Sequence, residues 1–269
     1  YNEAVVLVRS ELENATNLQM AADVEVGAFL SGGIDSTAVV ALMKTVSSSQ
    51  ISTYCLGFSE STYVQDETAF ASQTAKRLGC KHRNIILNND DIKDIFDEFI
   101  DFLDQPSIDG INTFLISKEV GKDLKVALSG LGGDEIFAGY EHFKTIQNYS
   151  KRKKNIIIDA LNKLNSIKPN SITNKYSLWG VNEEVSVTNL RSYYKSTQNI
   201  LEVSVEDVPI GRAANLSTVK RISKIEIEQY LLNTLLRDCD VLSMANSLEI
   251  RPVLLDQKLV ELVFSLPDE

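Results

Sequence analysis

The first half of the chain alternates between two hydrophobic periods. Short apolar runs bounded by polar residues predict buried strands at residues 26–30, 51–58, 82–87 and 125–129. Apolar residues spaced three or four apart predict helices at residues 3–16, 36–46, 66–79, 88–104 and 112–123. Strands that alternate with helices are typical of a parallel sheet with right-handed crossovers. The pattern therefore predicts an α/β fold with a doubly wound parallel sheet flanked by helices.

The second half of the chain has a weaker pattern. Between about Tyr149 and Ile222, Asn, Ser and Lys are frequent and β-type runs are absent, whereas a helical register returns from Ser223. We therefore expect an α/β core over residues 1–150. We expect a mainly helical portion over residues 151–269, which packs on the core as part of the same domain.

The helix predicted at residues 88–104 is strongly amphipathic. Its apolar residues, among them Ile92, Ile95, Phe96 and Phe99, are expected to face inward. Its many aspartates predict a solvated outer face.

The net charge is the feature of the composition that excludes a class of function. The net charge of −10 and the pI of about 4.9 argue against a general nucleic-acid binder, which would usually be basic. No apolar run has the length of a membrane span, and no signal peptide opens the sequence. Cys55, Cys80 and Cys239 are far apart and lack CxxC spacing, which fits a reducing compartment. We expect a cytoplasmic protein, and a fragment, because the sequence begins and ends abruptly.

The first candidate site is the turn Ser31-Gly32-Gly33-Ile34-Asp35-Ser36, between a predicted strand and a predicted helix. Its glycines allow close approach, and its backbone N–H groups and the positive end of the helix dipole suit phosphate oxygens. The turn matches neither the Walker A loop nor the dinucleotide fingerprint. Because a carboxylate repels phosphate unless a cation lies between them, Asp35 indicates a magnesium–nucleotide complex. The alternative is that Asp35 and Ser36 merely cap a helix that begins near Thr37.

A second turn repeats this architecture. The segment "KVALSGLGGDEIFAGY", residues 125–140, places Ser-Gly-Leu-Gly-Gly-Asp between a predicted strand and a predicted helix. In an open parallel sheet both turns would lie at the carboxyl ends of the strands, where ligands bind. Asp35 and Asp134 would then hold Mg²⁺ against a triphosphate from two sides.

Three segments of the chain resemble known families. "SGGIDS" resembles the pyrophosphate loop of the ATP pyrophosphatases. "SGLGGDEIFAGY" and "LLRDCDVLSMANSLEIRPVLLD" are similar to the synthetase domain of the asparagine synthetase family, and the resemblance extends from about Glu3 to Pro267. It implies an adenine nucleotide α-hydrolase-like fold and a reaction in which ATP and an acid give an acyl-adenylate and pyrophosphate. Ammonia then displaces AMP.

The resemblance also implies roles for individual residues. Asp35 and Asp134 would bind Mg²⁺ and act in catalysis together with Arg251, which with Glu249 would line the substrate pocket. The residues that would hold ATP are Leu30, Ser31, Gly32, Gly33, Asp35, Ser36, Leu56, Ser129 and Gly130.

The chain departs from the family pattern at three places. Leu131 stands where asparagine synthetases carry a glutamate, Tyr1 is not the cysteine nucleophile of a glutaminase domain, and Glu269 precedes a lysine of the family. We expect aspartate as the first candidate substrate, ammonia from a glutaminase domain absent from this chain, and no nucleic-acid or membrane partner. A homodimer stays open. The alternatives are an amide or lactam synthetase that uses another acid, and a nucleotide-binding module without catalysis.

Two further groups of residues have both a structural and a functional interpretation. Asp109 or Asn112 would cap the helix that follows the loop at residues 104–113, or this loop would cover the acceptor acid. Arg237 and Asp238, with neighbouring charged residues, are interpreted as a salt-bridge network that fixes helices against the sheet.

Overall fold

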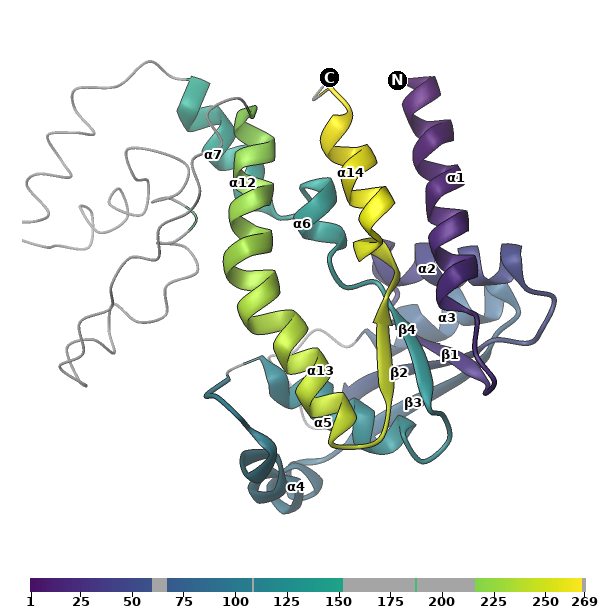
Figure 1. The fold of residues 1–269 in the computed structure, drawn as a ribbon. Helices are drawn as coiled ribbons and strands as arrows, with labels where there is room; N and C mark the ends of the chain where they lie inside the picture. Colours follow the sequence, from purple (N-terminus) through teal and green to yellow (C-terminus); the bar gives the residue numbers. More distant parts are fainter. Residues whose placement is uncertain (60–66, 108, 152–186, 188–215, 268–269) are drawn as a thin grey trace, which may run out of the picture. The chain divides into compact units, whose positions relative to one another are not determined.

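Five strands form one parallel sheet in the order β3-β2-β1-β4-β5 (Figure 1). The computed structural model describes residues 1–59, 67–107, 109–151, 187 and 216–267. The strands are β1 (Val26–Phe29), β2 (Ser52–Phe58), β3 (Lys81–Leu87), β4 (Val126–Ser129) and β5 (Glu249–Pro252). The chain builds outward from β1 to β3, then starts again on the other side of β1 with β4. The predicted doubly wound parallel sheet is therefore confirmed.

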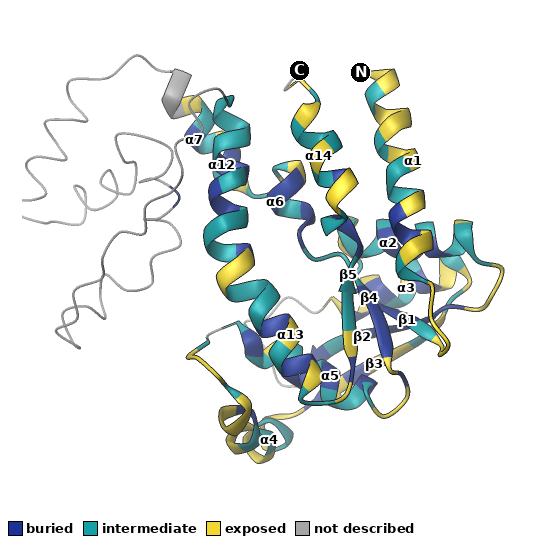
Figure 2. Ribbon diagram, viewed as in Figure 1, coloured by how far each residue is buried: buried dark blue, intermediate teal, exposed yellow. Residues whose placement is uncertain are grey.

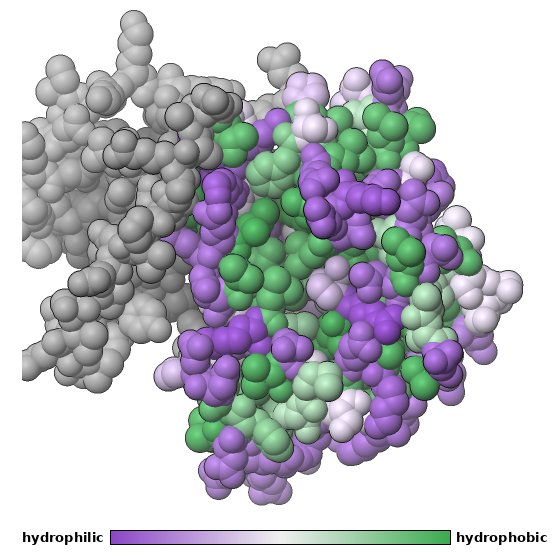
Figure 3. Space-filling view, in the orientation of Figure 1, coloured by the Kyte–Doolittle hydropathy of each residue, from purple (hydrophilic) through white to green (hydrophobic). Residues whose placement is uncertain are grey.

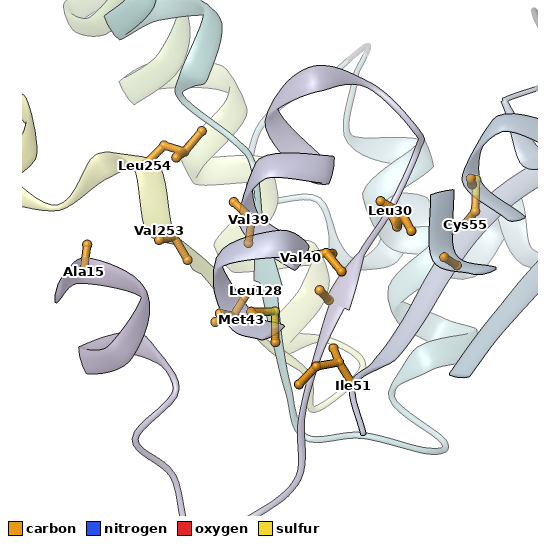
Figure 4. Close-up of a cluster of buried hydrophobic side chains, with 13 residues drawn as sticks. Ala15, Leu30, Val39, Val40, Met43, Ile51, Cys55, Leu128, Val253 and Leu254 are labelled. Atoms are coloured by element: carbon orange, nitrogen blue, oxygen red, sulfur yellow. The ribbon is translucent and has the colours of Figure 1, made fainter. Parts of the chain in front are cut away.

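Helices cover both faces of this sheet. On one face lie α1 (Asn2–Gln19), α2 (Ile34–Val46), α3 (Thr68–Leu78) and α14 (Gln257–Ser265). On the other face lie α4 (Asn89–Phe102), α5 (Gly110–Val120) and α13 (Arg237–Met244). The first face is held by a buried cluster that includes Val39, Met43 and Leu128, which Figure 4 shows between α2 and the sheet. Because helices cover both faces, the loops that leave the carboxyl ends of the strands meet at one edge of the sheet.

The described chain divides into two compact units. The sheet and the helices named above belong to Tyr1–Asp134 and Leu232–Pro267, and the second unit is Glu135–Leu231. The remaining elements are α6 (Gly133–Phe137), α7 (Glu141–Lys151), α12 (Thr218–Glu226), the π-helix η1 (Ile227–Leu236) and the 3₁₀-helix η2 (Val253–Leu255). The helical register predicted from residue 223 is confirmed, although part of it is π-helical. Most of the residues 151–222 lie outside the described part of the chain.

The amphipathic helix α4 matches its prediction except at one aromatic residue. Phe99 is 3% exposed, whereas Phe96 is 47% exposed, so the inward position predicted for Phe96 is wrong. The Phe96 ring still contacts the ring of Phe99, with 6.0 Å between the centroids, so Phe96 lies at the margin of the apolar face of α4. Figure 2 shows that much of α4 is exposed, and Figure 3 shows hydrophilic atoms beside hydrophobic ones in the region where α4 lies. None of the described helices has the length and apolar character needed to cross a bilayer.

Candidate active site

The first glycine turn links β1 to α2 and requires glycine at its tightest point. Gly32 has φ of +84°, a conformation that other residues rarely adopt, and a Cβ there would lie about 3 Å from the backbone of Phe70 and Ala71. Helix α2 begins at Ile34, and no side chain caps its first turn. Asp35 therefore lies inside the first turn, and the capping interpretation has no support from the geometry.

The serine hydroxyls of this turn point toward one another. Ser31 Oγ accepts a hydrogen bond from the N–H of Gly33 at 3.2 Å and shares one with Ser36 Oγ at 3.1 Å. Ser36 Oγ also lies 3.3 Å from the carbonyl oxygen of Gly33. The turn therefore gathers two hydroxyls at the positive end of α2, where the helix dipole favours an anion.

The second glycine turn has the same local design. Ser129 Oγ accepts a hydrogen bond from the N–H of Leu131 at 3.2 Å, which matches the bond between Ser31 and Gly33. Gly132 has φ of +92°, and a Cβ at this position would overlap the side chain of Leu255.

The structure packs the two turns directly against each other, because β1 and β4 are neighbours in the sheet. A Cβ on Gly130 would lie 2.8 Å from the backbone nitrogen of Ser36 and 2.9 Å from the carbonyl carbon of Asp35. A Cβ on Gly133 would overlap the carboxylate of Asp35. Glycine at both positions therefore brings the Asp35 carboxylate onto the second turn, next to Asp134.

The electrostatics of this pair fit a cation between the two carboxylates. Burial, and secondarily the negative charge of Asp134, raise the pKa of Asp35 above its ordinary value. Two carboxylates close enough to interact in this way repel each other until a positive charge is placed between them. Magnesium favours one or two carboxylates together with phosphate oxygens, so Asp35 and Asp134 fit the ion predicted from the sequence.

The raised pKa gives a prediction about stability. Between the unfolded and the folded pKa of Asp35 the native state binds more protons than the unfolded state, so stability falls as pH rises through this window. Asp35→Asn removes the charge and is expected to raise the melting temperature of the metal-free protein at pH 7 by roughly 1–3 °C. The gain is small because Asp35 is partly exposed and its charge is screened. Thermal denaturation in EDTA at pH 7 and pH 4 tests this, and a gain that does not shrink at pH 4 would contradict it.

A cavity of about 460 Å³ opens beside the two turns, at the carboxyl ends of the central strands. Its size is in the range of small-molecule sites. Its lining includes four residues predicted to hold ATP, namely Leu30, Ser31, Leu56 and Ser129. Ser31 and Ser129 thus belong both to the turns and to the cavity. The main lining residues that the sequence pattern did not indicate are Phe29, Tyr54, Phe58, Ile116, Leu235, Cys239 and Ile250.

Arg251 is not brought to the cavity. Its guanidinium donates hydrogen bonds to the carbonyl oxygen of Gln19, the last residue of α1, at 2.7 Å, to that of Ala21 at 3.0 Å, and to the carboxylate of Glu249 at 2.8 Å. The hydrogen bond from Arg251 lowers the pKa of Glu249. Side chains alternate along a strand, and it is the neighbouring Ile250 that lines the cavity. Neither Glu249 nor Arg251 is therefore among the described residues that line the cavity, and a catalytic role for Arg251 stays a prediction.

The segment predicted as a loop at residues 104–113 does reach the cavity. Asp109, which precedes α5, lines it together with Asn112 and Thr113 from the first turn of α5, so the functional interpretation of this segment has geometric support. Asp109 makes no side-chain cap on α5; instead Ser107 Oγ accepts a hydrogen bond from the N–H of Gly110 at 3.0 Å. The capping role predicted for Asp109 or Asn112 is thus taken by Ser107.

A doubly wound parallel sheet with two glycine turns and a cavity at its carboxyl edge defines an α/β domain whose candidate ligand site lies at the carboxyl ends of the strands. Residues 7–269 match the sequence profile of the family described as asparagine synthase, and the chain belongs to this family.

Curated relatives carry names that agree with the family. The chain is 28% identical to asparagine synthetase [glutamine-hydrolyzing] 1 of Bacillus subtilis, over 97% of this chain and 44% of the relative. It is also 28% identical to a putative asparagine synthetase of Mycobacterium tuberculosis, over 97% of this chain and 42% of the relative. The chain therefore spans less than half the length of these relatives.

Among solved structures, the chain is similar to an NH₃-dependent NAD synthetase from Campylobacter jejuni. The TM-score is 0.36 and the identity is 14%, over 84% of this chain and 96% of that chain. The strand order of this chain, and not that similarity, defines its fold.

Proposed function

We propose that this chain is the synthetase domain of an ATP-dependent, amide-forming ligase. The observation that carries the proposal is the contact between the two turns, in which Asp35 lies against Gly133 and beside Asp134. Membership in the asparagine synthase family supports the use of ATP. The names of the relatives support aspartate as the first candidate acid and ammonia from a glutaminase domain as the nitrogen source.

The proposed roles follow from the positions of the residues. The turn residues Ser31, Gly32, Gly33 and Ser36 hold the leaving pyrophosphate through backbone N–H groups and hydroxyls. Ser129 and Gly130 contact the phosphates from the other side. Leu30 and Leu56 hold the adenosine, and because the N–H of Leu30 already donates to Tyr54 at 2.8 Å, only its carbonyl oxygen remains for this. Asp35 and Asp134 hold Mg²⁺, which would neutralise charge on the phosphates.

The proposed reaction has two steps, which are formation of an acyl-adenylate and attack by ammonia. An oxygen of the acid attacks the α-phosphorus of ATP, the bond from that phosphorus to the bridging oxygen of the β-phosphate breaks, and pyrophosphate leaves. The nitrogen of ammonia then attacks the acyl carbon, the bond to the AMP oxygen breaks, and one proton is lost from nitrogen as the amide forms. In this proposal the backbone N–H groups of the turns meet the negative charge that develops on the leaving pyrophosphate.

An isotope-exchange experiment tests this proposal. The full-length protein, with Mg²⁺, ATP and aspartate, is expected to exchange labelled pyrophosphate into ATP, and the exchange is expected to need all three. Exchange that is equally fast without any acid, or Mg²⁺-ATP binding without exchange for every acid tried, would overturn the synthetase assignment. The second result would favour the nucleotide-binding module.

A further inference from the structure

The short helix α6 carries two consecutive carboxylates with different surroundings. Asp134 is partly exposed and close enough to Asp35 to raise its pKa, whereas Glu135 is only 1% exposed. The helix has five residues, which is too few for stability through its own hydrogen bonds. The position of Asp134 therefore depends on the contacts that hold the buried side of α6, where Glu135 lies.

Two hydroxyl groups hold Glu135. The hydroxyl of Tyr140 donates a hydrogen bond to Glu135 Oε1 at 2.6 Å, and the hydroxyl of the buried Ser223 donates to the backbone carbonyl oxygen of Glu135 at 2.5 Å. Tyr140 reaches back to Glu135 through a tight turn, in which Ala138 has φ of +57°. The carbonyl group of Glu135 belongs to the C-terminal end of α6, where helix carbonyl groups need partners from outside the helix. Ser223 provides such a partner from α12.

Helix α12 supports Tyr140 as well. The rings of Tyr140 and His142 stack with 5.3 Å between their centroids. His142 Nε2 lies 2.7 Å from Oε1 of the buried Glu226. Glu226 and Ser223 are three residues apart on α12 and therefore lie on one side of that helix. This side of α12 thus holds Glu135 directly, through Ser223, and supports Tyr140 through His142.

We infer that Tyr140 and Ser223 are positioning residues, whose hydrogen bonds to Glu135 hold α6 so that Asp134 is in place to bind the metal ion. This inference rests on the proposed function, in which Asp35 and Asp134 hold Mg²⁺. Magnesium requires nearly ideal octahedral geometry, so a small rotation of α6 weakens its binding. Groups that orient a metal ligand without touching the metal commonly tune metal affinity.

Metal binding is measured without turnover. Full-length protein with α,β-methylene-ATP is titrated with Mn²⁺, which prefers the same oxygen ligands as Mg²⁺ and is detected by EPR. Tyr140→Phe and Ser223→Ala each remove one hydroxyl and keep the rest of the side chain. Each is expected to raise the Kd for Mn²⁺ by about 3- to 10-fold, less than the loss of a group bonded to the ligand itself. In the exchange assay, the Mg²⁺ concentration for half-maximal rate is expected to rise similarly, while the rate at saturating Mg²⁺ stays within about twofold of wild type.

Ser117→Ala is the matched control. Ser117 is also a buried serine, but it lies on α5, and its hydroxyl has no hydrogen-bond partner among the described residues. The substitution is expected to leave the Kd for Mn²⁺ unchanged. Thermal denaturation in EDTA shows which variants are folded at the assay temperature.

The outcomes separate this inference from the proposed function. A wild-type Kd for Mn²⁺ in both Tyr140→Phe and Ser223→Ala would overturn the positioning role and leave the synthetase assignment in place. A lower exchange rate at saturating Mg²⁺, with an unchanged Kd, would also overturn it, because the two hydroxyls would then act on folding alone. Absence of exchange with every acid in the wild type would overturn the synthetase assignment, whereas a raised Kd in both variants would still support the positioning role.

Discussion

Asp35→Asn is expected to lower Mg²⁺-dependent pyrophosphate exchange by about 100- to 1,000-fold. The substitution keeps the size of the side chain and removes one of the two carboxylates proposed to hold the metal, whose charge stabilisation is worth several kcal/mol. The same variant is expected to be slightly more stable than the wild type without metal, because it removes the cost of burying the Asp35 charge and, secondarily, the repulsion from Asp134. Exchange assays over a range of Mg²⁺ concentrations, paired with thermal denaturation, measure both effects.

Asp90→Asn is the matched control for this experiment. Asp90 also lies in the first turn of a helix, but in α4, where it pairs with Lys93 and is not among the residues that line the cavity. Its exchange rate and Mg²⁺ dependence are expected to match the wild type. Wild-type exchange by Asp35→Asn, at the Mg²⁺ concentration that saturates the wild type, would refute the metal assignment.

Gly133→Ala is expected to lower exchange by roughly 10- to 100-fold without unfolding the protein. The added Cβ overlaps the carboxylate of Asp35, which is the flexible end of a side chain and moves away at little cost to the fold. A displacement on the order of 1 Å at a catalytic centre is enough for a loss of this size. The Mg²⁺ concentration for half-maximal exchange is expected to rise as well, because the displaced oxygen is a proposed metal ligand.

Gly79→Ala is expected to have the opposite effect: it lowers the folding stability and leaves the exchange activity unchanged. Gly79 ends α3 with φ of +68°, and a Cβ there would meet nothing within 4 Å. The substitution is expected to cost about 1–2 kcal/mol of folding stability through backbone strain and to leave exchange unchanged. Urea unfolding and exchange measured on both alanine variants separate strain from displacement of the carboxylate. A Gly133→Ala variant with wild-type exchange would contradict the packing of the two turns.

The parts of the fold that could be predicted from the sequence are those with a strong local signal. The strands β1 to β4 are short apolar runs, and the helices between them have clear periods, so the sheet and the position of both turns follow from the pattern. The candidate metal pair could be predicted because a carboxylate inside a phosphate-binding turn has few physical explanations. In the structure, the contact between Gly133 and the Asp35 carboxylate brings Asp35 next to Asp134.

The parts that could not be predicted depend on contacts between distant segments. The strand β5, "EIRP", is only four residues long and has one clearly apolar residue, which is too short a pattern to predict a strand; its backbone pairs with β4. Arg251 carries a charge that suggests chemistry, yet carbonyl oxygens near the end of α1 bind it. Ser107 was not predicted as the cap of α5, because its second partner, Asp238, comes from α13.

The pairing of β1 with β4 also determines when the proposed phosphate site comes into existence. Val26 pairs with Val126, so the two turns meet only after a long segment of chain has been closed into the sheet. Such long-range pairing forms slowly compared with local helices. A growing chain that has reached β1 and α2 contains the first glycine turn. It still lacks the second glycine turn, which follows β4. Any ligand that needs both turns will bind the completed sheet alone, and its binding energy will add to the stability of that one pairing.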